Sequence, residues 1–233
     1  MKRIVAIATY NEAENIEKLV RGILSLGLGL EVLVIDDNSP DGTGEIAEGL
    51  AAETGMVKVV HRPGKLGLGT ATLEAVKYAV ENSYDILVTM DADFSHDPKY
   101  LPAMLAKSKD YDVVVGSRYV RGGGVVNWPL SRRLMSFAVN FYCRVMLGLD
   151  AHDCSGAYRA YKRWVLEGID AEKFISRGYS FQEEMLARCS RQKAKIGEVP
   201  IVFVDRAKGA TKANRAEMIR SSLALLRLGL WGF

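Results

Sequence analysis

The stretch YDILVTMDADFSHDP, residues 84–98, decides the fold prediction. It begins as an apolar run rich in β-branched residues and then places two carboxylates, Asp91 and Asp93, two positions apart. Such a run is typical of a buried strand, and the Asp97-Pro98 pair that follows is typical of a helix start. The stretch therefore predicts a strand, an acidic loop and a helix, as in an α/β protein.

The same alternation continues on both sides of this stretch. It predicts βαβ units and hence an α/β fold with a mostly parallel sheet and helices on both faces. The expected strands are 3–8, 31–35, 57–61, 86–90, 112–115 and 195–204. The expected helices are 12–25, 42–53, 70–82, 99–107, 131–147, 162–167, 180–191 and 214–228. No linker-like segment appears, so residues 1–233 are expected to form one domain.

The amino-acid composition limits the classes of protein to which this chain can belong. The chain has 233 residues, 48% of them hydrophobic and 25% charged, which is ordinary for a globular protein. Its three widely spaced cysteines suggest neither a disulfide framework nor a zinc site, and they fit a reducing, cytosolic compartment. The N-terminal residues predict a first strand rather than a signal peptide, and no run approaches the roughly 20 apolar residues of a membrane span.

Charge divides the chain into two unlike halves. Residues 1–116 carry 11 Lys/Arg and 18 Asp/Glu, whereas residues 117–233 carry 20 and 10. A basic half suits phosphates or anionic lipid headgroups, and a solvated basic surface explains the count equally well.

Carboxylates follow two of the predicted strands, at the sheet edge where α/β proteins bind ligands. Asp91 and Asp93 could hold Mg²⁺ or Mn²⁺, which take one or two carboxylates together with substrate phosphates. A loop that caps the helix near Pro98 is the alternative. We expect Asp37 to contact a nucleotide and Asp36 to be structural, although turn chemistry accounts for both.

Three further features receive structural interpretations. The string GKLGLGT, residues 64–70, lacks the phosphate-loop spacing and predicts a tight turn into a helix. His96 is expected to pack beside the helix start. An apolar stripe along helix 131–147 is more often core, although it could instead accompany a greasy ligand tail along Phe137, Phe141 and Val145.

Arginines gather in the second half, where guanidinium groups could make bidentate phosphate contacts. The chain resembles the polyprenyl-phosphate (dolichol-phosphate) mannose synthases, family 2 glycosyltransferases with the GT-A fold. The motifs that carry the resemblance run in order over nearly the whole chain: TYNEAENI (9–16), DDNSPDGT (36–43), GLGTA (67–71), DADFSHDP (91–98), GSRYVRGGG (116–124), DCSGAYRAY (153–161), GYSFQEEM (178–185) and EVPIVFVDRAKGATK (198–212).

The resemblance implies an activity and a location. It implies inverting transfer of mannose from GDP-mannose to polyprenyl or dolichyl phosphate, with Mg²⁺ or Mn²⁺, on the cytosolic face of a membrane. Residues 1–116 would bind the nucleotide sugar and residues 117–233 the acceptor. Some members of the family attach to the membrane through C-terminal helices, and here peripheral attachment or an anchoring partner subunit would serve instead. No nucleic acid partner is expected.

The resemblance also assigns roles to individual residues. Catalysis is assigned to Asp93, Arg118 and Glu184, and the cation to Asp91, Asp93 and Ser95. The acceptor phosphate is assigned to Arg118, Arg132 and Ser136. The nucleotide sugar is assigned to Ala8, Tyr10, Glu12, Ile35, Asp37, Asp91, Ala92, Asp93, Arg118, Val199, Arg206 and Lys212.

Some alternatives remain open at this level. Glu184 is expected to orient the sugar or the acceptor pocket, and capping of the helix near Ser180 explains it comparably well. Two alternative functions remain. The protein could transfer a sugar from another donor, such as UDP-glucose, or it could be a non-catalytic subunit that binds a nucleotide sugar. A dinucleotide-dependent oxidoreductase is set aside, because TYNEAEN stands where a G-x-G-x-x-G would follow the first strand.

Overall fold

The structure is a computed structural model that describes residues 1–176, 178, 180–205 and 223–229. A seven-stranded sheet with the order β3-β2-β1-β4-β7-β5-β8 forms its centre. The strands are β1 (Arg3–Thr9), β2 (Leu30–Asp36), β3 (Val57–His61), β4 (Ile86–Asp91), β5 (Val113–Ser117), β7 (Arg159–Lys162) and β8 (Ile196–Pro200). All neighbouring pairs are parallel except those that β7 makes with β4 and β5.

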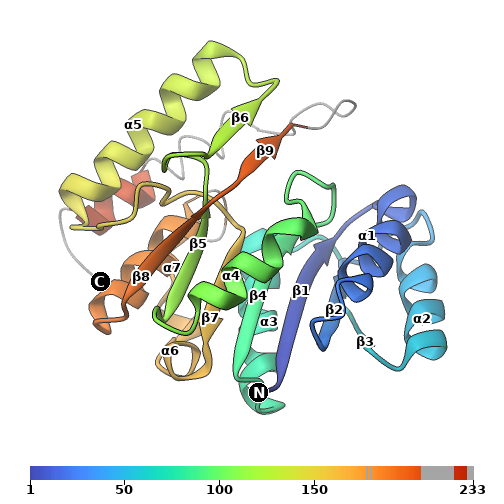
Figure 1. The fold of residues 1–233 in the computed structure, drawn as a ribbon. Helices are drawn as coiled ribbons and strands as arrows, with labels where there is room; N and C mark the ends of the chain where they lie inside the picture. Colours follow the sequence, from blue (N-terminus) through green and yellow to red (C-terminus); the bar gives the residue numbers. More distant parts are fainter. Residues whose placement is uncertain (177, 179, 206–222, 230–233) are drawn as a thin grey trace.

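Helices cover both faces of this sheet (Figure 1). Apolar residues alternate along each strand, so each face builds its own core. One core includes α1 (Ala13–Ser25), α2 (Thr43–Thr54) and α4 (Leu101–Lys107). The other includes α3 (Leu68–Glu81), α6 (Arg163–Glu167) and α7 (Phe181–Arg191). The predicted α/β fold with a mostly parallel sheet is confirmed.

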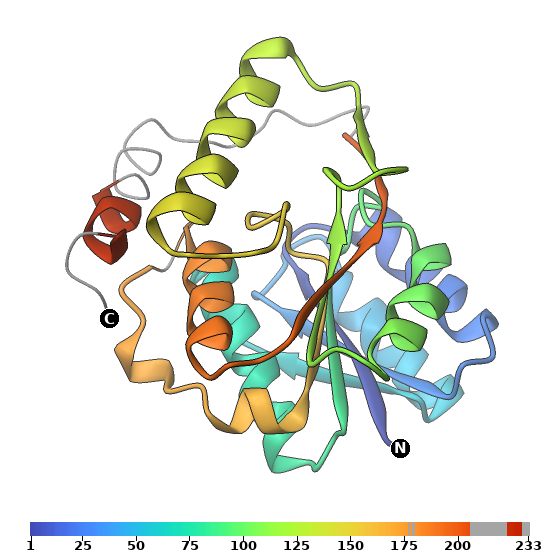
Figure 2. The ribbon, with the colours of Figure 1, turned by 60° about the vertical axis from the view of Figure 1, so that its left-hand side comes forward.

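The second half adds a layer beyond the sheet. Strands β6 (Gly124–Val126) and β9 (Val202–Val204) form a two-stranded parallel ribbon, and α5 (Leu130–Met146) follows β6 directly. Figure 2 shows α5 and this ribbon standing above the edge to which β1 points. Residues 223–229 are helical, and Leu225 and Leu228 join the core beneath α5.

The strands of the second half differ from the sequence prediction in several places. The segment 195–204 was expected as one strand, but β8 ends at Pro200 and β9 joins the other sheet. Proline has no N–H to donate, so it suits the end of a strand. Strand β7 was not predicted, because its four residues carry no readable alternation.

The glycine-rich loop after β5 allows a close backbone approach. A Cβ atom on Gly123 would lie 2.5 Å from the carbonyl oxygen of Ser117. Only glycine fits against that backbone, and the turn brings β6 and α5 back over the end of β5. The loop thereby holds Arg118 near α5.

Candidate active site

The carboxyl ends of three neighbouring strands meet at one point of the sheet edge. In the register of the sheet, Ala8 on β1 lies opposite Ile35 on β2 and Asp91 on β4. Residues predicted to bind the nucleotide sugar therefore lie together here. Beside them, Asp36 accepts hydrogen bonds from Thr9 Oγ1 (3.0 Å) and Ser39 Oγ (2.5 Å), which confirms its predicted structural role.

Asp37 forms a buried ion pair that sequence reasoning missed. Arg62, the residue after β3, donates from Nε to Asp37 Oδ1 at 2.5 Å and from Nη1 to Thr70 Oγ1 at 2.8 Å. Both Asp37 and Arg62 are buried. The pair joins the loop after β2 to the start of α3. In the sequence, an arginine directly after a predicted strand could have indicated this pair.

The loop after β1 faces the glycine-containing loop before α3. Lys65 Nζ lies 4.7 Å from the centre of the Tyr10 ring, a cation–π distance. Glu12 is buried, its N–H donates to Thr43 Oγ1, and its carboxylate accepts from Asn15 Nδ2. The string 64–70 thus forms a turn into α3, as predicted, and also brings a lysine to a predicted nucleotide residue.

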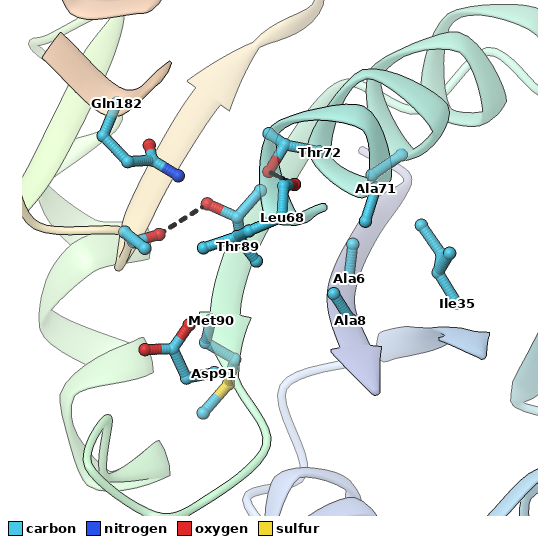
Figure 3. A pocket seen from close by; sticks show the side chains of 12 residues that line it. Ala6, Ala8, Ile35, Leu68, Ala71, Thr72, Thr89, Met90, Asp91 and Gln182 are labelled. Carbon is cyan, nitrogen blue, oxygen red and sulfur yellow. Dashed lines mark hydrogen bonds between the residues drawn. The ribbon is translucent and has the colours of Figure 1, made fainter. Parts of the chain in front are cut away.

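A small pocket opens between β1, β4 and α3 (Figure 3). Its walls are mostly small residues, among them Ala6, Ala8 and Ala71, and Asp91 lies at the end of β4. Gln182 reaches in from α7 and is 4% exposed, and its Oε1 accepts no hydrogen bond from any residue that the structure describes. Gln182 was not singled out from the sequence beyond its place in the GYSFQEEM motif.

His96 shapes the turn that carries the two aspartates. Its Nδ1 accepts a hydrogen bond from the N–H of Asp91 at 3.0 Å, and its ring stacks on Tyr158 with 5.0 Å between centroids. Burial lowers the pKa of His96, so the ring is neutral and can accept this bond. The predicted packing role of His96 is confirmed, while the Asp91 side chain stays 31% exposed.

Ser95 is oriented toward the second aspartate. Its N–H and hydroxyl both donate to Asp93 Oδ1, at 3.1 and 2.6 Å. Ser95 and Ala92 are buried, whereas Asp93 is partly exposed. Ser95 therefore positions the Asp93 carboxylate, and its role as a cation ligand stays a prediction.

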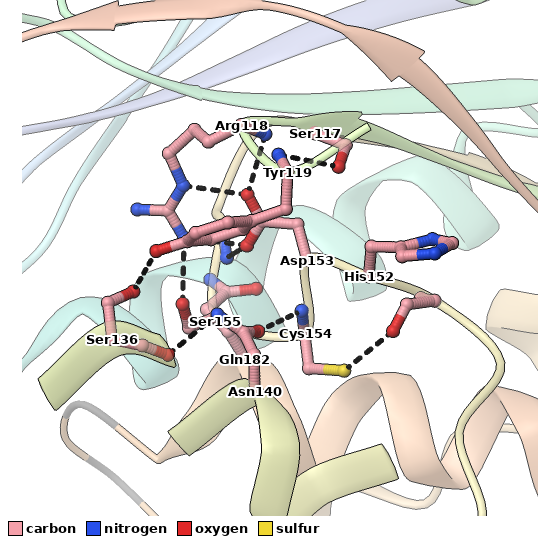
Figure 4. Close-up of polar contacts among 12 residues, drawn as sticks. Ser117, Arg118, Tyr119, Ser136, Asn140, His152, Asp153, Cys154, Ser155 and Gln182 are labelled. Carbon is pink, nitrogen blue, oxygen red and sulfur yellow. Dashed lines mark hydrogen bonds and ion pairs between the residues drawn. The ribbon is translucent and has the colours of Figure 1, made fainter. Parts of the chain in front are cut away.

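Arg118 is held by a buried aspartate (Figure 4). Its Nε donates to Asp153 Oδ2 at 2.7 Å, and its Nη2 donates to Asp153 Oδ1 at 2.6 Å and to Ser155 Oγ at 2.7 Å. Although burial opposes ionisation of both groups, their pairing lowers the pKa of Asp153 and raises that of Arg118. Arg118 Nη1 makes no hydrogen bond within the described chain, so it can still serve an anion.

The other predicted acceptor residues lie beside Arg118. The Trp128 ring centre is 5.1 Å from the Arg118 guanidinium carbon and 4.2 Å from that of Arg132. The Tyr119 hydroxyl donates to Ser136 Oγ at 2.7 Å and so joins the Arg118 loop to α5. Figure 4 shows this link. The structure thus brings Arg118, Arg132 and Ser136 together.

A chain of rings connects the aspartates to the arginines. The His96 ring lies 5.5 Å from Phe203 of β9, and Phe203 lies 5.6 Å from Trp128. The sequence analysis did not select Phe203 and Trp128. Their position near the arginine motifs could have indicated that they pack beside the arginines. Since His96 bonds Asp91 and Trp128 stacks on Arg132, the two predicted binding regions are neighbours.

Two predicted site residues have buried side chains. Glu184 is fully buried, accepts from the N–H groups of Ile175 and Ser176, and forms an ion pair with Arg188 at 2.6 Å. Because its carboxylate holds the segment before α7, these contacts favour the structural alternative, and a role of Glu184 in orienting the sugar or the acceptor pocket stays a prediction. Val199 is buried in the core on β8, and its assignment to the donor stays a prediction. Arg206 and Lys212 lie outside the described residues.

Comparison with known proteins adds the family. The model of glycosyl transferase family 2 matches residues 4–169. The chain belongs to this family. An undecaprenyl-phosphate mannosyltransferase from Micrococcus luteus is 42% identical over 99% of this chain and 95% of its own length. A polyprenol monophosphomannose synthase from Mycolicibacterium smegmatis is 41% identical over 99% of this chain and 87% of its own. This protein is therefore a glycosyltransferase.

A solved structure of the same fold supports the architecture. The mannosyltransferase PcManGT from Pyrobaculum calidifontis, solved in complex with GDP-Man and Mn²⁺, superposes with a TM-score of 0.63. It is 20% identical, and the match covers 97% of this chain and 62% of that one. At this identity the likeness establishes the shared GT-A fold, and the bound donor and ion belong to that protein.

Proposed function

We propose that this glycosyltransferase moves mannose from GDP-mannose to a polyprenyl monophosphate, with inversion at the anomeric carbon. One observation carries the proposal: Asp91 and Arg132, which belong to the two predicted binding regions, are linked by ring contacts through His96, Phe203 and Trp128. The mannosyltransferase relatives, similar over nearly their whole length, support the choice of substrates.

The donor would lie across the ends of β1, β2 and β4. Tyr10, with Lys65 over its ring, offers a flat surface for a base, and Asp37 offers a carboxylate for a ribose or a base N–H. Lys65 carries a positive charge near the place where phosphates would lie. Gln182, with an unused Oε1 in the pocket next to Asp91, is suited to accept a hydrogen bond from a sugar hydroxyl.

The two aspartates fit a divalent cation, Mg²⁺ or Mn²⁺. Carboxylate oxygens are the ligands that hard cations prefer, and the Asp91 side chain is accessible. Within the described residues, no three His, Cys, Asp or Glu side chains are placed to hold a metal ion. Besides Ser95, whose role as a ligand stays a prediction, the remaining ligands would be diphosphate and water oxygens. When bound, such a cation supplies charge stabilisation for the departing GDP.

The acceptor needs no general base. The second pKa of a phosphate monoester is about 6, so the acceptor is largely a dianion at neutral pH and already nucleophilic. Arg118 Nη1 and Arg132 would hold the phosphate while one of its oxygens bonds to the anomeric carbon and the bond to GDP breaks. The protein's task is alignment and charge stabilisation, so no base is required of Glu184, whose contacts favour a structural role.

The lipid tail and the membrane would meet α5. An apolar stripe runs along its exposed face: Leu130, Leu134, Phe137, Phe141 and Val145, each at least 61% exposed. Among the described residues the stripe is not part of the core, which favours a contact with a lipid tail over a core role. With Arg133 and Arg144 also exposed on α5, this face suits an anionic membrane surface.

We therefore propose peripheral attachment to the cytosolic face of a membrane, and an anchoring partner subunit on the same face is the alternative. Across the residues that the structure describes, no helix is both long and apolar enough to span a bilayer.

Product formation with separate nucleotide sugars tests the proposal. Purified protein, a short-chain polyprenyl monophosphate and Mn²⁺ are incubated with GDP-mannose or with UDP-glucose, and the glycolipid is extracted and quantified. We expect turnover with GDP-mannose and loss of turnover with excess chelator. Turnover with UDP-glucose alone would favour the other donor, and no turnover with any donor while GDP-mannose still binds would favour the non-catalytic subunit.

A further inference from the structure

The two arginines of the acceptor site are neutralised in different ways. Asp153, the partner of Arg118, is fully buried and accepts hydrogen bonds from Arg118 Nε, Nη2 and N–H and from the Gly156 N–H. Asp205, the partner of Arg132, has a side chain that is 24% exposed. One partner is therefore fixed by its surroundings, whereas the other is open to exchange.

Asp205 is held at its backbone but only lightly at its carboxylate. Its N–H donates to the carbonyl of Val126 at 3.2 Å, just beyond the β6–β9 ribbon. Within the described chain, its carboxylate makes one hydrogen bond, from Arg132 Nη1 to Oδ2 at 2.5 Å. The side chain can therefore leave Arg132 without any change in the sheet.

Arg132 has donors that Asp205 does not use. Its Nε and Nη2 make no hydrogen bond to any residue that the structure describes, and its side chain is 30% exposed. The neighbouring Trp128 Nε1–H is buried and likewise donates to nothing in the described chain. A tetrahedral anion with several oxygens can use more of these donors than one carboxylate oxygen does.

We propose that Asp205 is an internal competitor of the acceptor phosphate for Arg132. This rests on the proposed function, because it takes Arg132 as the acceptor-phosphate residue. An anion that takes Arg132 Nη1 together with the unused donors must displace this carboxylate, so the affinity for all such anions falls by the same factor. A lipid-linked phosphate recovers affinity through its chain along the exposed apolar face of α5, whereas free inorganic phosphate does not. Asp205 thereby keeps soluble phosphate from occupying the acceptor site.

The test compares Asp205→Asn and Asp205→Glu with the wild-type full-length chain. With GDP-mannose and Mn²⁺ saturating, we measure the KM for a short-chain polyprenyl monophosphate and the inhibition constant of inorganic phosphate. Exposed ion pairs are weak, so we expect Asp205→Asn to lower both constants by about two- to fivefold and by the same factor. Asp205→Glu, which keeps the negative charge, should stay near the wild type.

Other results would overturn the inference. A higher acceptor KM in Asp205→Asn would mean that Asp205 positions Arg132 for the acceptor, and unchanged constants would mean that the two anions do not compete. A shift in the lipid constant alone would also contradict it, because the displaced carboxylate is common to both ligands.

A binding measurement separates this inference from the proposed function. Titration calorimetry of inorganic phosphate and of polyprenyl monophosphate, without any nucleotide sugar, needs no transfer reaction. If the protein transfers no mannose but Asp205→Asn still binds both anions more tightly, the proposed function fails and the competition stands. If mannose is transferred but binding of both anions is unchanged in Asp205→Asn, the competition fails and the proposed function stands.

Discussion

Arg118 and Asp153 form a two-pronged ion pair, with Nε to Oδ2 at 2.7 Å and Nη2 to Oδ1 at 2.6 Å, and the Asp153 side chain is fully buried. Removal of the aspartate would leave the guanidinium in a largely buried place without its counter-charge. We expect Asp153→Ala to lower the free energy of unfolding by about 3–5 kcal/mol, measured by urea denaturation.

The matched control for this pair is Asp205→Ala, which removes the partner of the other acceptor arginine. Because that pair is partly exposed, its loss should cost only about 0–1 kcal/mol. Equal losses of stability in the two variants would contradict the distinction between a fixed and an exchangeable partner.

Asp93 tests the role of the acidic turn. Asp93→Asn keeps the size of the side chain and an oxygen that can still accept from Ser95, but it removes the negative charge. We expect cation-dependent turnover to fall at least about a hundredfold while the melting temperature changes little. Asp97→Asn, at the start of the following short helix, is the control and should retain activity. Full activity of Asp93→Asn would rule out the cation role.

Glu183 predicts a pH-dependent stability. Burial raises its pKa from the usual 4.5 to about 7, and its Oε2 accepts no hydrogen bond in the described chain. The folded state thus holds the proton to higher pH than the unfolded state does. The stability that this carboxyl group contributes is fully present below about pH 4.5 and is lost as the pH rises to about 7.

Glu183→Gln cannot ionise and should therefore escape this loss. Relative to the wild type, its free energy of unfolding should rise between pH 5 and pH 8 by up to about 3 kcal/mol, measured by denaturant titration at both values. Glu184→Gln is the neighbouring control, and it should be destabilised at both pH values because Glu184 pairs with Arg188. A pH-independent difference for Glu183→Gln would show that the carboxyl group does not titrate in this range.

The exposed face of α5 predicts how the protein attaches to lipid. Phe137 and Phe141 are 64% and 61% exposed, so replacing both with serine should leave the fold intact. Each phenylalanine that enters a bilayer interface contributes on the order of 1.5–3 kcal/mol, so vesicle binding should fall at least about tenfold in a sedimentation assay. Met56→Ser, between α2 and β3, is the control. Unchanged binding in the double variant would place the lipid contact elsewhere.

The first half of the fold could be predicted because local signals and packing agree there. Apart from the partly exposed β3, its strands are buried apolar runs, and its helices have apolar faces, so periodicity indicates the right elements. Register then follows, because the strands are parallel neighbours and their carboxyl ends meet, as Ala8, Ile35 and Asp91 show.

The second half depends on contacts that no local pattern encodes. β7 carries Arg159 into the sheet, where its Nη1 donates to the carbonyl of Gln182 and its Nη2 to that of Cys154. The sequence also did not show which charged residues form ion pairs. Arg118 pairs with Asp153, and Asp37 pairs with Arg62. Motif resemblance located the arginines and aspartates, whereas the contacts of Glu184 with Arg188 and with the N–H groups of Ile175 and Ser176, which favour a structural role, were not read from the sequence.

A crystal structure with Mn²⁺, GDP and a short-chain polyprenyl monophosphate tests the central claim most directly. The account predicts Mn²⁺ bound to the carboxylates of Asp91 and Asp93 and to the diphosphate, with the lipid phosphate at Arg118 Nη1 and Arg132. Mn²⁺ bound away from both aspartates, or a lipid phosphate bound away from the Trp128 arginines, would contradict it.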